Sequence, residues 1–129
     1  MNLVDSSGWL EYLAEGRNAD FFASALEATS ELVVSAINIY EVFKHVLREQ
    51  GEDKALRAAA LMQQAVVVDV TAPISMEAAK LSQELGLPMA DSLILATARA
   101  YKATLWTQDA DFESIDGVRF ISKRTDRRR

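Results

Sequence analysis

The amino-acid sequence predicts an α/β fold in which a parallel central sheet of about four to five strands carries helices on both faces. Short apolar runs of strand length alternate along the chain with longer segments whose apolar residues recur at helical spacing. Right-handed crossovers between such strands place helices on both faces of one sheet. The 129 residues suffice for one domain with its own core. We expect that domain at 1–122 and a flexible basic tail at 123–129.

The first half of the chain predicts two strands and four helices. The runs NLVD and ELVVSA are short and apolar, as strands of a buried sheet are. Serines follow the first run and can cap a helix, and Gly51 can end a later one. An alanine-rich segment after Gly51 has high helix propensity. The strands are expected at 2–5 and 31–36, and the helices at 6–16, 19–29, 37–51 and 53–65.

The second half predicts three more strands and three more helices. VVVDV is β-branched and predicts a central parallel strand. Pro73 and Pro88 stand just before helical patterns, where proline is tolerated. The strands are expected at 66–70, 104–107 and 118–121, and the helices at 72–86, 89–103 and, as a short one, 109–115.

Composition indicates a soluble protein without thiol chemistry. The chain has no cysteine, which excludes disulfides and a cysteine nucleophile, and it has neither a secretory pattern nor a run of about 20 apolar residues. We therefore expect no membrane association and a cytoplasmic location. The net charge is −5, and because residues 123–129 carry +4 the remaining body is near −9. Such a body does not bind nucleic acid by bulk electrostatics, although the tail can contact phosphates.

Four acids distant in sequence are expected at one edge of the sheet. Asp5 ends the first strand, and Asp109 follows the strand TLWT by two residues. Glu41 lies one turn into its helix, and Asp91 lies in the first turn of another. In open parallel sheets, functional groups gather at the carboxyl ends of the strands. Each acid alone has a structural explanation, as a helix cap, a surface residue or a charge at a helix N-terminus. Together they predict a functional site.

Carboxylates at short range repel one another unless a cation neutralises them. With oxygen ligands only, the expected cation is Mg²⁺ or Mn²⁺. Such an ion activates water and polarises a phosphoryl oxygen, and a pair of ions about 3.5–4 Å apart serves in-line displacement. The acids therefore favour hydrolysis of phosphodiesters. Ser6 and Thr107 are expected to bond an acid or a metal-bound water, and Asn38 shares a helix face with Glu41.

These acids stand in motifs that resemble those of PIN-domain ribonucleases, in particular the small VapC-like toxins of type II toxin–antitoxin pairs. The matching motifs cover essentially the whole chain in the same order: LVDSSGWL, SAINIYEVFK, GLPMADSLILATA and LWTQDADF. The resemblance implies a PIN fold over 1–122 and a metal-dependent endoribonuclease that acts on RNA. It also implies a cognate antitoxin as partner and a homodimer.

Asp5, Glu41 and Asp91 match the acidic residues of the family, and the fourth acid is open between two positions. Asp109 holds the threonine-x-acid place, where many relatives have asparagine followed by an aspartate just before phenylalanine. Asp111 matches that aspartate. We favour Asp109 as the metal ligand and interpret Asp111 as a helix cap that shares the metal in the alternative.

Other readings of single residues and of the whole chain stay open. His45, the single histidine, is expected to be a packed or partly exposed residue, or else a contact of the site. Tyr40, Phe43 and Leu47 share one side of their helix, which we expect in the core, or in part at a dimer or antitoxin face. A non-catalytic acidic pocket that binds RNA, or a receiver-like signalling module, also places acids at strand ends. A receiver needs paired acids after its first strand, where this chain has Asp5 and serines.

Overall fold

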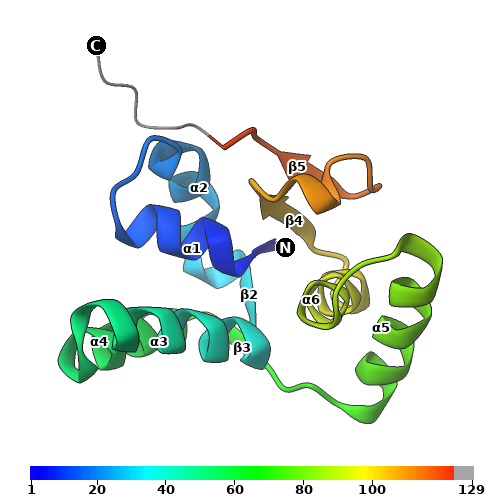
Figure 1. Cartoon of the computed structure of the whole chain (residues 1–129), viewed down its shortest axis with the longest axis horizontal. Helices are drawn as coiled ribbons and strands as arrows, with labels where there is room; N and C mark the ends of the chain where they lie inside the picture. The colour runs from blue at the N-terminus through cyan, green and yellow to red at the C-terminus, as the bar shows by residue number, and fades with distance from the viewer. Residues whose placement is uncertain (124–129) are drawn as a thin grey trace.

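A computed structural model of the chain describes residues 1–123, and its sheet has five parallel strands (Figure 1). The predicted tail at 123–129 lies outside the described residues except for Lys123, so the boundary after 122 stays a prediction. The strands are β1 Asn2–Val4, β2 Leu32–Ser35, β3 Val66–Val68, β4 Thr104–Thr107 and β5 Val118–Phe120. The helices are α1 Ser6–Leu13, α2 Ala19–Leu26, α3 Ala36–Gln50, α4 Glu52–Met62, α5 Ala72–Leu85 and α6 Met89–Ala100, with single 3₁₀ turns η1 Thr29–Glu31 and η2 Ala110–Phe112.

The sheet order β3-β2-β1-β4-β5 places β1 at the centre, and every strand pair is parallel. Val4 at the end of β1 lies opposite Trp106 in β4, so Asp5, which follows β1, lies beside Thr107 at the end of β4. The register thus places the carboxyl ends of the two central strands level at one edge.

Alternate side chains of the inner strands β1, β2 and β4 enter two separate apolar cores. Leu3 and its neighbour Leu105 pack on α5 and α6, whereas Val4 and Trp106 pack on α1 to α4. Figure 1 shows α5 and α6 together on one side of the sheet and α1 to α4 on the other. Both faces of the inner strands β1, β2 and β4 are therefore buried, which explains why their sequences are mostly apolar instead of alternating. The predicted α/β architecture is confirmed.

Two predictions about apolar residues are wrong. VVVDV forms β3 at the edge of the sheet, not at its centre, and it leaves Val66 44% and Val67 39% exposed. A β-branched run indicates a strand, but its place in the sheet depends on which partners remain. Tyr40 and Leu47 are likewise exposed on α3 instead of lying in the core. Helix α3 buries Val42 and Val46, which lie on one side of the helix. Tyr40 and Leu47 lie on another side and therefore face solvent.

Helix ends also differ from the predicted ranges. The helix expected at 19–29 ends at Leu26 and is followed by η1, and the one expected at 109–115 is only the single turn η2. None of the described helices is both long and apolar enough to cross a membrane.

We predict that Gly8→Ala lowers the free energy of unfolding by about 1–2 kcal/mol. A Cβ at Gly8 would lie 2.5 Å from Val4 Cγ1 and 2.7 Å from Phe22 Cε1, and both side chains are fully buried. Overpacking costs about 1–3 kcal/mol, which exceeds the helix propensity gained over glycine, about 0.5–1 kcal/mol. Urea unfolding measures the change. Ser24→Ala on the exposed side of α2 is the control, expected within about 0.5 kcal/mol of the parent. An unchanged Gly8→Ala midpoint would show that α1 can move away from β1.

Candidate metal centre

The predicted acids come from four separate segments that meet at the carboxyl edge of the sheet. Asp5 follows β1 directly, and Asp109 lies two residues beyond β4. Asp91 is in the first turn of α6, and Glu41 is in the second turn of α3, which begins right after β2. Each of these helices or loops starts where a strand ends or points its N-terminus at the same edge, so the topology gathers residues that are far apart in sequence.

Asp5 is almost fully buried, with 3% of its surface exposed, and hydrogen bonds hold both of its carboxylate oxygens. Oδ1 accepts from the Gly8 backbone N–H and the Ser7 hydroxyl, each at 2.9 Å. Oδ2 accepts from the Thr107 hydroxyl at 2.5 Å. Asp5 therefore caps α1, as its structural explanation required, and also faces the site. Thr107 Oγ1 in turn accepts from the Asp109 backbone N–H at 2.9 Å, so one hydroxyl links two of the acids.

Glu41 is positioned by a chain of neutral polar groups. Ser6 Oγ donates to Glu41 Oε1 at 2.6 Å and accepts from Asn38 Nδ2 at 3.1 Å. Asn38 is fully buried, and its Oδ1 accepts from the Ser35 backbone N–H, which closes the capping box of α3. The same residues thus start the helix and aim the carboxylate. Ser6 bonds an acid as predicted, and Asn38 reaches Glu41 through Ser6.

Asp91, Asp109 and Asp111 form a cluster in which one carboxylate oxygen from each lies within 4.8 Å of the others. The structure therefore brings both candidates for the fourth acid beside Asp91. The interpretation of Asp111 as a helix cap is wrong, because Asp109 is the cap of η2 and its Oδ1 accepts from the Asp111 backbone N–H at 3.0 Å. The single turn folds Asp111 back toward Asp109. Asp111 is exposed, and the other two are partly buried.

Burial and the negative charges of neighbouring acids shift the pKa of Asp5 and of Asp91. Burial raises the pKa of Asp91 to about 7, and the negative charges of Asp109, Asp5, Glu41 and Asp111 add to the shift. Burial likewise raises the pKa of Asp5 to about 6, although the hydrogen bonds from Thr107, Gly8 and Ser7 act in the opposite direction. Both shifts reflect negative charge that is confined and poorly solvated. A cation among these groups would remove that cost.

The donors at the site fit a hard divalent cation. They are carboxylate oxygens with hydroxyl groups behind them, the ligand type that Mg²⁺ and Mn²⁺ prefer. His45 is not among the clustered groups. It is partly buried one turn along α3, and its Nδ1 lies 3.3 Å from Arg48 Nη2. The chemistry of the donor set thus agrees with an oxygen-ligated metal and gives the single histidine no ligand role.

The chain has an α/β fold with a five-stranded parallel sheet and acids at the carboxyl edge of that sheet. Sequence comparison identifies its family. The PIN domain family model matches residues 3–118, and the chain belongs to the PIN domain family. Comparison with curated proteins gave no match.

Solved structures with this fold include toxins of VapBC pairs, which confirms the resemblance seen in the motifs. A toxin–antitoxin complex from Klebsiella pneumoniae is 27% identical, with a TM-score of 0.76 over 92% of this chain and 95% of that chain. VapC20 of Mycobacterium tuberculosis, a sarcin-ricin loop cleaving toxin, is 22% identical, with a TM-score of 0.72 over 90% and 95%. DNA-bound VapBC from Salmonella typhimurium is 16% identical, with a TM-score of 0.72 over 95% and 98%.

We predict that Thr107→Val lowers the free energy of unfolding by about 2 kcal/mol at pH 8, whereas Thr107→Ser stays close to the parent. Valine keeps the shape but removes the hydroxyl that donates to Asp5 and accepts from Asp109. A hydrogen bond to a charged group contributes about 1.5–3 kcal/mol. Urea unfolding of the three proteins measures the difference. Equal losses in the serine and valine variants would assign the effect to packing instead of the hydroxyl.

We predict that Asp91→Asn stabilises the metal-free protein at pH 8 but not at pH 4. The pKa of Asp91 is about 7 in the folded protein, against 3.8 for an ordinary aspartate such as that of the unfolded chain. Ionisation of Asp91 is therefore less favourable in the folded state than in the unfolded state. The contribution of Asp91 to stability is therefore full below about pH 4 and is lost as the pH rises through about 7. Solvent screening of this partly exposed group limits the gain to about 1 kcal/mol. Urea unfolding in EDTA at both pH values measures it.

The matched control is Asp116→Asn, because Asp116 is exposed and lies outside the cluster. It should leave the pH dependence of the parent unchanged. An Asp91→Asn variant that is equally destabilised at both pH values would mean that Asp91 is a structural cap and carries no electrostatic cost.

Proposed function

We propose that this chain is a Mg²⁺- or Mn²⁺-dependent endoribonuclease and the toxin of a toxin–antitoxin pair. The observation that carries the proposal is the convergence of Asp91, Asp109 and Asp111 within 4.8 Å, with Asp5 and Glu41 close enough to raise the pKa of Asp91. Membership of the PIN domain family and the toxin neighbours support it. The sheet order also differs from the 2-1-3-4-5 order of receiver-like modules, which disfavours that alternative.

Asp5, Glu41, Asp91 and Asp109 would hold the ion, with Asp111 beside them. When bound, such a cation would neutralise the carboxylates and would supply an activated water and a polarised phosphoryl oxygen for hydrolysis of RNA. Thr107, Ser7 and the Gly8 N–H keep Asp5 oriented, and Ser6 keeps Glu41 oriented, without adding positive charge. The exposed side of the cluster, at Asp111, is open to an RNA strand.

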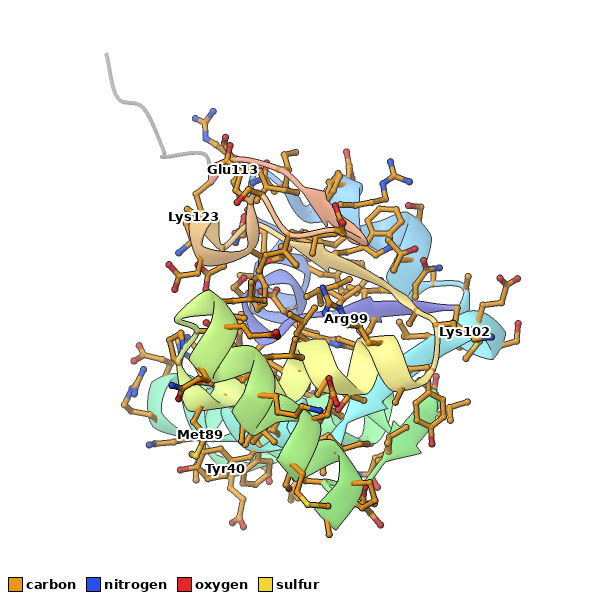
Figure 2. All side chains as sticks on the ribbon, turned by 90° about the vertical axis from the view of Figure 1, so that its right-hand side faces the viewer. Tyr40, Met89, Arg99, Lys102, Glu113 and Lys123 are labelled. Carbon is orange, nitrogen blue, oxygen red and sulfur yellow. The ribbon has the colours of Figure 1, made fainter. Side chains whose placement is uncertain are left out.

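Basic residues must offset the repulsion between RNA phosphates and this acidic edge. A hollow of about 360 Å³ beside Asp109 is also lined by Glu113 and Lys123, and Figure 2 shows Glu113 and Lys123 on the same side of the molecule. Lys123 begins the basic segment 123–129. We propose that this segment contacts phosphates next to the scissile bond.

The partner we propose is a cognate antitoxin, and the acting form a homodimer in the cytoplasm. Several of the structural neighbours are toxin–antitoxin or VapBC assemblies. The exposed Tyr40 and Leu47 of α3 offer an apolar surface for such contacts, in line with the alternative that the sequence left open for this helix side.

We predict metal-dependent cleavage of RNA that Asp91→Asn reduces more than about 100-fold. Loss of a group behind a metal ligand already costs about 10–100-fold, and loss of a ligand should cost more. The full chain, freed of any partner, is incubated with a mixed RNA pool in Mg²⁺, Mn²⁺ or EDTA, and products are separated on denaturing gels. Asp116→Asn removes an exposed acid outside the cluster and should cleave like the parent.

The proposal fails if the parent neither binds Mn²⁺ at millimolar concentration nor cuts RNA with any metal. Tight Mn²⁺ binding without cleavage would instead assign the chain to the non-catalytic, RNA-binding alternative. Cleavage that persists in EDTA would exclude a metal role for the acidic cluster.

A further inference from the structure

Asn18 and Gln108 form a buried pair of amide side chains that the proposed chemistry does not explain, and Gln108 directly precedes Asp109 of the acidic cluster. We propose that Asn18 is a positioning residue of the metal centre, which acts through Gln108 on the loop that carries Asp109. The inference rests on the proposed function and extends it to a residue from a loop that holds none of the acids.

Asn18 joins three parts of the chain that are remote in sequence. Its Nδ2 donates to Gln108 Oε1 at 2.8 Å and to the Ser122 backbone carbonyl at 3.0 Å. Asn18 is 1% exposed and Gln108 is 6% exposed, so water does not compete for these bonds. The carboxamide therefore ties the α1–α2 loop to the segments that follow β4 and β5.

The α1–α2 loop holds Asn18 rigidly. Its backbone N–H donates to Glu11 Oε2 at 2.7 Å. Gly16 leaves room for that carboxylate, since a Cβ there would lie 2.4 Å from Glu11 Oε2. The loop thus has a fixed anchor in α1, and Asn18 can transmit that position to Gln108.

Gln108 stands between the two residues whose placement the metal centre needs most. Thr107 before it bonds Asp5 and the backbone of Asp109, and Asp109 after it bonds the backbone of Asp111. Gln108 Nε2 also lies 3.5 Å from the Ser7 carbonyl, in the turn whose hydroxyl bonds Asp5. A shift of the Gln108 side chain would consequently move Asp109 relative to Asp5.

The buried carboxamide of Asn18 lowers the stability of the folded state. Within residues 1–123, the buried Asn18 Oδ1 has no hydrogen-bond partner. An unpaired buried polar atom costs about 1–3 kcal/mol, and an apolar side chain of similar size would avoid that cost. The cost is accounted for if the two Nδ2 bonds fix a geometry that the site requires.

The test compares Mn²⁺ affinity with stability in the full chain. Asn18→Ala, Gln108→Ala and the double variant are titrated with Mn²⁺ by calorimetry, and thermal unfolding is followed in EDTA. The matched control is Asn2→Ala, which removes the acceptor of Trp106 Nε1 on β4, the strand that precedes Gln108. We expect Asn18→Ala to weaken Mn²⁺ binding about tenfold, whereas Asn2→Ala changes it less than about twofold. The double variant should bind Mn²⁺ as tightly as whichever single variant binds it less tightly, because the two residues act through the same hydrogen bond.

Asn18→Leu provides a second variant if alanine prevents folding. Leucine has a similar size but no hydrogen-bond donors, and it adds no buried charge beside the Glu11 carboxylate. Weaker Mn²⁺ binding in this variant therefore reports lost geometry. Unchanged Mn²⁺ affinity in the Asn18 variants, with the same loss of melting temperature as Asn2→Ala, overturns the inference and makes Asn18 purely structural. A parent that binds no Mn²⁺ at all refutes the metal centre itself, which is a separate result.

Discussion

Repulsion between carboxylates at one edge of the sheet is the constraint on which the rest of the structure depends. Asp5, Asp91 and Asp109 come from segments that the fold gathers, and confinement raises the pKa of the first two. A protein selected for stability alone would disperse such charges, because an unpaired and poorly solvated carboxylate destabilises the folded state. The cation that we propose for this site would remove that cost.

The groups that hold these acids are neutral, which preserves the charge that a cation needs. Ser6, Ser7 and Thr107 donate hydroxyl bonds to the carboxylates, and the Gly8 N–H adds one from the start of α1. A lysine or arginine in these places would orient an acid equally well but would also neutralise it. Packing serves the same end, since Gly8 lets α1 lie close to β1 and so presents the N–H to Asp5.

Local pattern predicted the order of the elements and the placement of the four acids at one edge of the sheet, because strands that end in acids are visible in sequence. The sequence did not show which elements pack against one another. The place of β3 depends on which strand edge is free, and the exposure of Tyr40 depends on which helix side meets α4 or the sheet. Asp109 and not Asp111 caps η2, and a single 3₁₀ turn of this kind leaves little signal in the sequence. The bond between Asn18 and Gln108 spans 90 residues and follows no periodicity, so only the folded chain reveals it.

The pKa of Asp91 helps to distinguish a structural from a functional reason for this acid. A helix N-terminus favours a nearby negative charge by about 0.3–1 kcal/mol, less than one pKa unit, which corresponds to about 1.4 kcal/mol. If that stabilisation were the reason for an acid in the first turn of α6, the pKa of Asp91 would fall below 3.8. It stands at about 7 instead, so burial and the neighbouring acids outweigh the dipole. The helix start thus does not explain Asp91, whereas the cation that we propose for Asp91, Asp109 and Asp111 would.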